Sequence, residues 1–165
     1  KPTIYLETTI FGYLAMRAAS EVRSQANQEI TRDWWHNRRH EFELFVSRFV
    51  VEECGRGDPD AAAERNVFLD GLPLLNVAND VVELADALIA DALIADLALP
   101  KKAYVDAMHI SIAAANGIDY LMTWNCSHIA NAALIRKIEK VLIDRGLEPP
   151  VICTPRNFSE EEHVF

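Results

Sequence analysis

Five short apolar runs, separated by stretches with helical patterning, constrain the fold of this chain more than any other feature. The runs are TIYLE (3–7), FELFVS (42–47), PLLNV (73–77), YLMTW (120–124) and VICT (151–154). Strands that alternate with helices in this way are typical of an α/β fold with a mostly parallel sheet. The sequence therefore predicts a five-stranded, mostly parallel sheet, and ligands of such sheets bind beyond the carboxyl ends of the strands.

Local signals indicate where the helices between these runs begin and end. Asp58 and Pro59 supply an N-cap and a proline at the first helical position, which predicts a helix to about Leu69. Asp80 and Glu83 form a capping-box pattern before a long apolar helix. That helix contains the repeat ADALIADALIADL (85–97), which we interpret as a local duplication within a core helix. Further helices are expected over 21–39, 100–116 and 132–145.

The composition is that of one globular domain spanning residues 1–165. Half of the 165 residues are hydrophobic and a quarter are charged, a balance that excludes a disordered chain. Charges interrupt every apolar stretch before the roughly 18 residues that a membrane span needs, and no secretory signal is visible at the N-terminus. The three cysteines, Cys54, Cys126 and Cys153, form no CxxC pair, so we expect a reduced, cytoplasmic protein.

The charge of the chain is acidic overall but unevenly distributed. The formal net charge is −9, which taken alone argues against a nucleic-acid partner. Six of the eleven arginines, however, fall between Arg17 and Arg48, and six acids fall between Asp80 and Asp106. Such a distribution is compatible with a basic face, or with an acidic pocket whose charge a bound cation offsets.

Polar side chains gather at the predicted strand ends. Glu7 ends the first run, Asn125 follows the fourth, and Glu53 comes shortly after the second. Asp106 lies early in the helix before the fourth run, at the edge of that helix's apolar face. Singly, each has an ordinary explanation: Glu7, Thr8 or Thr9 could cap the following helix. Together, three carboxylates and an amide suit Mg²⁺ or Mn²⁺, which chiefly serve phosphoryl chemistry.

These same segments carry a family resemblance. The order YLETT, VVEECGRG and VDAMHISIAAANGIDYLMTWN resembles the PIN-domain family, and more narrowly the VapC-like toxins of bacterial toxin–antitoxin pairs. The resemblance spans about residues 3–154. It implies a three-layer α/β/α sandwich around the sheet, metal-dependent cleavage of RNA, a homodimer and neutralisation by a small cognate antitoxin.

The family pattern also assigns roles to residues of this chain. It places Glu7, Glu53, Asp106 and Asn125 as catalytic and metal-binding residues, with Mg²⁺ or Mn²⁺ as the cofactor. The sequence departs from the pattern twice, since Glu7 and Asn125 each stand where the family usually has Asp. An amide ligates a hard cation more weakly than a carboxylate does, so one strongly held ion is expected rather than two.

Supporting roles are expected for neighbouring side chains. Thr8, Thr9 and Thr123 would orient the carboxylates. His109 and His128 each lie three residues after a site residue, and as ligands they would favour Mn²⁺ or a later metal over Mg²⁺. Packing or solvation is the ordinary role of a lone histidine.

The stretch DWWHNRRHEF (33–42) is a candidate RNA contact. Trp34, Arg38 and Arg39 could stack bases and bind phosphates. The alternative is that the tryptophans belong to the core and that the arginines are merely solvated.

Other functions remain open at this point. A degenerate PIN-like domain would bind RNA or a protein partner without cleavage. A phosphatase or nucleotide-binding domain would share the strand-tip carboxylates. The chain has no glycine-rich phosphate loop of either common pattern, which weakens the nucleotide-binding alternative. Thr8 and Thr9 follow Glu7 where an aspartyl-phosphate phosphatase has a second acid, which disfavours a phosphatase.

Overall fold

A computed structural model describes residues 1–15, 21–92, 100–125 and 129–159. Its sheet has four strands, all parallel, in the order β2-β1-β3-β4. The strands are β1 (Thr3–Leu6), β2 (Glu43–Phe45), β3 (Tyr120–Met122) and β4 (Val151–Cys153). The helices are α1 (Thr8–Ala15), α2 (Val22–Asn37), α3 (Arg48–Cys54), α4 (Pro59–Leu69), α5 (Asn79–Asp91), α6 (Pro100–Ala115) and α7 (Ala132–Asp144), with short 3-10 turns η1 (Arg39–Glu41) and η2 (Pro155–Phe158).

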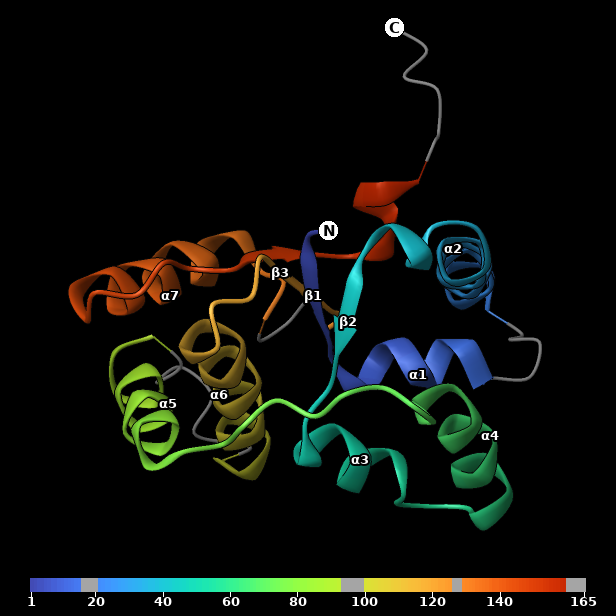
Figure 1. The fold of residues 1–165 in the computed structure, drawn as a ribbon, viewed down its shortest axis with the longest axis horizontal. Coiled ribbons are helices and arrows are strands. Elements are labelled where there is room, and N and C mark those ends of the chain that lie inside the picture. Colours follow the sequence, from blue (N-terminus) through green and yellow to red (C-terminus); the bar gives the residue numbers. More distant parts are fainter. Residues whose placement is uncertain (16–20, 93–99, 126–128, 160–165) are drawn as a thin grey trace, which may run out of the picture.

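The helices cover the sheet from both sides. Helices α5, α6 and α7 gather on one side of the strands, and α1, α2 and α4 on the other (Figure 1). Consistent with this cover, Ile4, Tyr5 and Leu6 of the central strand β1 are all fully buried, as expected where both faces of a parallel sheet are packed against helices. The predicted α/β sandwich is therefore confirmed.

The prediction of a fifth strand over 73–77 was wrong for the described chain. This segment forms one isolated parallel bridge between Val46 and Leu74. Pro73 has no N–H to donate to a ladder, and Leu74 is 58% exposed, so little apolar burial favours a longer strand there.

The helix signals succeeded in most places. Asp58 accepts a hydrogen bond from the Ala61 N–H and caps α4, which ends at Leu69 as predicted. The predicted capping box at Asp80 was wrong: the N-cap of α5 is Ala78, two residues earlier, and it makes no side-chain cap. The last part of the 85–97 repeat, residues 93–97, lies outside the described residues. No helix in the described ranges has the length and apolar character needed to cross a membrane.

Candidate active site at the carboxyl end of the sheet

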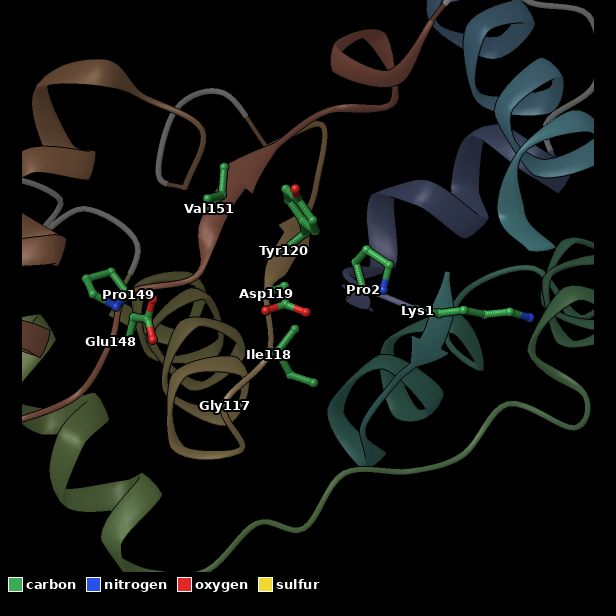
Figure 2. Close-up of a pocket in the computed structure, with 9 residues that line it drawn as sticks. All are labelled: Lys1, Pro2, Gly117, Ile118, Asp119, Tyr120, Glu148, Pro149 and Val151. Atoms are coloured by element: carbon green, nitrogen blue, oxygen red, sulfur yellow. The ribbon is translucent and has the colours of Figure 1, made fainter. Parts of the chain in front are cut away.

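Cavities lie at both ends of the strands. At the amino ends, a cavity of about 570 Å³ is lined by residues that include Lys1, Asp119 and Glu148 (Figure 2). The Asp119 carboxylate there accepts hydrogen bonds from the backbone N–H (2.9 Å) and hydroxyl (3.1 Å) of Thr3, which ties the start of β1 to the start of β3. Asp119 therefore has a structural role at this end of the sheet.

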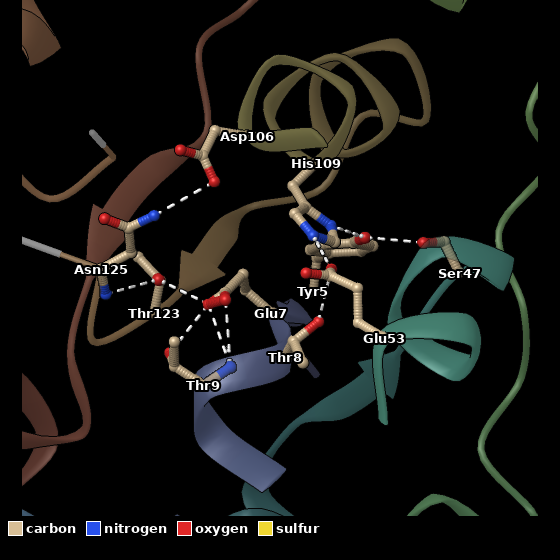
Figure 3. A network of polar contacts seen from close by, with 10 residues as sticks. All are labelled: Tyr5, Glu7, Thr8, Thr9, Ser47, Glu53, Asp106, His109, Thr123 and Asn125. Atoms are coloured by element: carbon tan, nitrogen blue, oxygen red, sulfur yellow. Dashed lines mark hydrogen bonds and ion pairs between the residues drawn. The ribbon is translucent and has the colours of Figure 1, made fainter. Parts of the chain in front are cut away.

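Glu7 follows β1 directly and occupies the start of α1. Its carboxylate accepts hydrogen bonds from the Thr9 N–H (3.0 and 3.1 Å to its two oxygens), the Thr9 hydroxyl (2.7 Å) and the Thr123 hydroxyl (2.8 Å). Figure 3 shows these bonds converging on the one carboxylate. Glu7 therefore caps α1, the ordinary role considered from the sequence, and the hydroxyls of Thr9 and Thr123 hydrogen-bond to its carboxylate.

Burial governs the charge of Glu7. The residue is only 4% exposed, and this burial raises its pKa, partly offset by the nearby charge of His109 and by the hydrogen bonds from Thr9 and Thr123. The site thus holds one carboxyl group that takes up a proton more readily than an exposed glutamate does.

Glu53 belongs to a second hydrogen-bonded group, which links α3 to the core. Its Oε1 accepts from the Thr8 hydroxyl and pairs with His109 Nε2, both at 2.7 Å. The His109 Nδ1 lies 2.6 Å from the Tyr5 hydroxyl, which lies 2.7 Å from the Ser47 hydroxyl (Figure 3). Because a carboxylate can only accept, His109 Nε2 carries a proton; in the neutral ring, Nδ1 then accepts from Tyr5.

This environment shifts the pKa values of Tyr5 and Glu53 in opposite directions. Burial raises the pKa of Tyr5 well above its usual range, so Tyr5 stays a neutral hydroxyl. Burial alone would also raise the pKa of Glu53, but the hydrogen bond and charge of His109, the Thr8 hydroxyl and the charge of Arg56 outweigh it, and the pKa is lowered. Glu53 is thus held as a carboxylate, whereas burial shifts the pKa of Glu7 in the opposite direction.

Asp106 and Asn125 face each other across the same site. The Asn125 amide Nδ2 donates to Asp106 Oδ1 at 3.1 Å, and Asp106 is 5% exposed. The Asn125 backbone N–H donates to the Thr123 hydroxyl at 2.9 Å, so Thr123 joins this pair to Glu7. A carboxylate at position 125 would meet the Asp106 charge directly, whereas the amide offers a donor.

A cleft of about 920 Å³ collects these groups. Glu7, Glu53, Asp106 and Asn125 all line it, together with five basic side chains: Arg23, Arg56, Arg65, Lys101 and Lys102. These basic residues were not identified from the sequence, because they come from four separate segments of the chain. The one available signal was the Lys101-Lys102 pair, one helical turn before Asp106.

The basic side chains differ in what else they do. Arg65 donates to the backbone oxygens of Cys54 (2.9 Å) and Arg56 (2.6 Å), so it closes the carboxyl end of α3, the helix that carries Glu53. Arg56, Lys101 and Lys102 are exposed. The cleft thus has carboxylates within and solvated cations at its border, which is a charge pattern suited to a phosphodiester bound through a metal.

The predicted RNA contacts Trp34, Arg38 and Arg39 do not line this cleft. Trp34 is 1% exposed, so the prediction that it stacks on a base was wrong, and the alternative of a core tryptophan holds. Arg38 pairs with Glu41 at 2.8 Å. Arg39 lies over the Trp35 ring, 4.5 Å from its centroid, and lines another cavity. His128, the other predicted histidine, lies outside the described residues.

The donor set can be tested for its fit to a divalent cation. Carboxylate and amide oxygens are the ligands that Mg²⁺ and Mn²⁺ prefer. Within the described ranges, no three His, Cys, Asp or Glu side chains are grouped closely enough to enclose an ion. His109 uses both ring nitrogens in hydrogen bonds, so it supports Glu53 instead of offering a free ligand. The set therefore fits an open, water-rich ion held by one or two carboxylates, as is common for Mg²⁺.

Comparison with known proteins identifies the fold. No protein-family model and no curated protein sequence matches the chain. Among solved structures, Mycobacterium tuberculosis VapC20, a toxin that cleaves the sarcin–ricin loop, matches with a TM-score of 0.51 and 18% sequence identity. The match covers 78% of this chain and 94% of that one. The chain accordingly has the PIN-like fold expected from its sequence, with four strands in the described sheet.

Proposed function

We propose that this protein is a metal-dependent endoribonuclease that hydrolyses RNA phosphodiester bonds, and that it is the toxin of a toxin–antitoxin pair. One observation carries the proposal: Glu7, Glu53, Asp106 and Asn125 line a single cleft at the carboxyl ends of parallel strands. The likeness of the fold to that of VapC20 supports RNA as the substrate class.

Each side chain has a definite task in this proposal. Glu53 and Asp106 hold a Mg²⁺ or Mn²⁺ ion, with Asn125 and Glu7 beside it. When bound, the ion would make a water molecule more acidic and offset negative charge on the phosphodiester. His109 and Thr8 keep Glu53 ionised and aimed, and the exposed cations at the border attract the RNA backbone.

The proposal extends to partners and location. We infer a cytoplasmic homodimer that a small cognate antitoxin neutralises, on the strength of the family resemblance. An antitoxin-like reading frame beside the gene would support this part of the proposal.

A second candidate function has its own support. Glu7 uses its carboxylate to cap α1, and Asn125 supplies an amide where the family has an acid. A degenerate PIN-like domain that binds RNA or a protein partner without cleaving would keep the cleft and its basic border while lacking turnover.

A cleavage assay separates the two. Purified protein is incubated with a mixed set of structured RNAs in Mg²⁺, in Mn²⁺ and in EDTA, beside Asp106→Asn and the matched control Asp144→Asn. Asp144 is an exposed acid paired with Lys140, outside the cleft. The nuclease proposal expects cleavage that needs metal, survives in Asp144→Asn and disappears in Asp106→Asn. Folded protein that binds RNA but cleaves none with either metal would instead establish the binding function.

A further inference from the structure

Two aromatic rings line the active-site cleft beside its carboxylates. Trp124 and Tyr13 both belong to the lining of the cleft, and both are partly exposed. Their rings meet edge to face, with centroids 5.8 Å apart and planes at 65°. Unlike Trp34 and Trp35, which are 1% and 5% exposed, Trp124 is partly exposed and lines the cleft.

Hydrogen bonds hold Trp124 both at its backbone and at its indole ring. Its backbone N–H donates to the Thr9 hydroxyl at 2.8 Å, and its indole N–H donates to the Thr31 hydroxyl of α2, also at 2.8 Å. The Thr31 hydroxyl in turn donates to the Asn27 backbone oxygen at 2.6 Å. Because the ring is already ordered, little additional conformational entropy is lost when a flat ligand stacks on it.

Position along the chain connects the ring to the chemistry. Trp124 stands between Thr123, which donates to Glu7, and Asn125, which donates to Asp106. Arg23 and Asn27, both on α2, line the same cleft and supply a cation and an amide near the aromatic pair. An aromatic surface, a neighbouring cation and adjacent carboxylates are the elements that a nucleotide with an exposed base would contact.

We propose that the Tyr13–Trp124 pair is a stacking platform for one unpaired base of the RNA, next to the phosphate that is cut. This inference rests on the proposed function and narrows it to single-stranded segments, because the bases of a duplex are already stacked on one another and cannot reach the ring. The platform would then select where along an RNA chain the protein acts.

Fluorescence titration in EDTA tests the platform without requiring catalysis. The probe is a single-stranded RNA hexanucleotide of mixed sequence, compared with the same backbone carrying abasic riboses and with an RNA duplex. Since Trp34 and Trp35 are buried, a change in emission on binding should be lost in Trp124→Phe and kept in Trp35→Phe. Trp124→Ala should weaken binding of the normal hexanucleotide by about 5- to 100-fold, the loss expected for one stacked base.

The abasic probe separates stacking from a merely structural role of Trp124. Binding of the abasic strand should already be weak and should change little in Trp124→Ala, while Trp124→Phe should retain most of the affinity for the normal strand. Lys101→Ala is the matched control, because loss of a phosphate contact weakens both strands equally. Should Trp124→Ala prove unfolded, Tyr13→Ala provides the same comparison with the indole and its hydrogen bonds left in place.

Several outcomes would overturn the platform. The first is equal affinity of the wild-type protein for the normal and abasic strands. The second is an equal loss of affinity for both strands in Trp124→Ala. Tighter binding of the duplex than of the single strand, or no binding of the hexanucleotide, would also overturn it. Failure of the cleavage assay with intact, base-dependent binding would overturn the nuclease and leave the platform standing. Metal-dependent cleavage with base-independent binding would overturn the platform and leave the nuclease proposal standing.

Discussion

Replacing Thr123 with valine removes the hydroxyl that joins the two halves of the site. The Thr123 side chain is fully buried, and its Oγ1 both donates to Glu7 Oε2 at 2.8 Å and accepts from the Asn125 N–H at 2.9 Å. Valine has nearly the same shape, so the change deletes both hydrogen bonds while opening almost no cavity. It removes one of the donors to Glu7 and takes away the hydroxyl that accepts from the Asn125 N–H.

The size of the effect follows from these two losses. A hydrogen bond to a charged group contributes roughly 1.5–3 kcal/mol, and a buried donor left without a partner costs about 1–3 kcal/mol. Because Thr9 still holds Glu7, the lower halves of these ranges apply, and we expect the free energy of unfolding to fall by about 2.5–4 kcal/mol. For a chain of this length, the corresponding fall in Tm is about 5–15 °C.

Thr3→Val is a matched control, because Thr3 makes the same two kinds of hydrogen bond at the surface. Its hydroxyl donates to Asp119 Oδ2 at 3.1 Å and accepts from the Asp119 N–H at 2.9 Å. Asp119 is exposed, so water replaces the lost partners, and we expect a loss below about 1 kcal/mol. Urea unfolding in EDTA at neutral pH, followed by circular dichroism, compares the two. Equal losses in Thr123→Val and Thr3→Val would refute the reasoning.

Three further predictions concern the charges of the site, all in metal-free buffer unless stated. Because burial raises the pKa of Glu7, protonated Glu7 contributes stability that is present below the unfolded-state pKa and is lost as pH rises through the folded-state pKa. Glu7→Gln should remove this part of the pH dependence of the free energy of unfolding, measured by urea unfolding at several pH values. An unchanged pH dependence would contradict the raised pKa. Because His109 helps to lower the pKa of Glu53, ionised Glu53 contributes stability above its unfolded-state pKa, and this stability is lost on acidification. Glu53→Gln should therefore have a lower free energy of unfolding than wild type at neutral pH, and the difference between the two proteins should shrink in acid. Asn125→Asp replaces the amide that donates to Asp106 with a second carboxylate, so the Tm of this variant should fall in EDTA. Added Mn²⁺ should then raise its Tm by more than it raises the Tm of wild type. An equal rise in Tm in both proteins would count against an ion bound between Asp106 and residue 125.

Local patterns were sufficient for most of the fold. The apolar runs located β1, β2, β3 and β4, and the Asp58-Pro59 pair located the start of α4. These signals act over a few residues, through side-chain burial and capping, and so they can be read from the chain directly. The segment over 73–77 failed because strand length depends on what lies beside it, and there only Val46 pairs with Leu74.

The candidate site was predictable in part. Strand tips in a parallel sheet point to one edge, so the sequence alone could group Glu7, Glu53, Asp106 and Asn125 at that edge. Their catalytic and metal-binding roles remain predictions. The pattern could not show that Trp34 is buried, because a helix of mixed polarity does not reveal which of two adjacent tryptophans meets the core, and here both do.

The sequence by itself thus determined the α/β class and the grouping of Glu7, Glu53 and Asp106 at one end of the sheet. Only the tertiary structure decided which partners those acids have. It placed His109 between Glu53 and Tyr5, assigned the Glu7 carboxylate to the start of α1, and assembled a basic border from separate segments. Such pairings join residues up to 116 positions apart, and they depend on how whole elements pack, which no local pattern encodes.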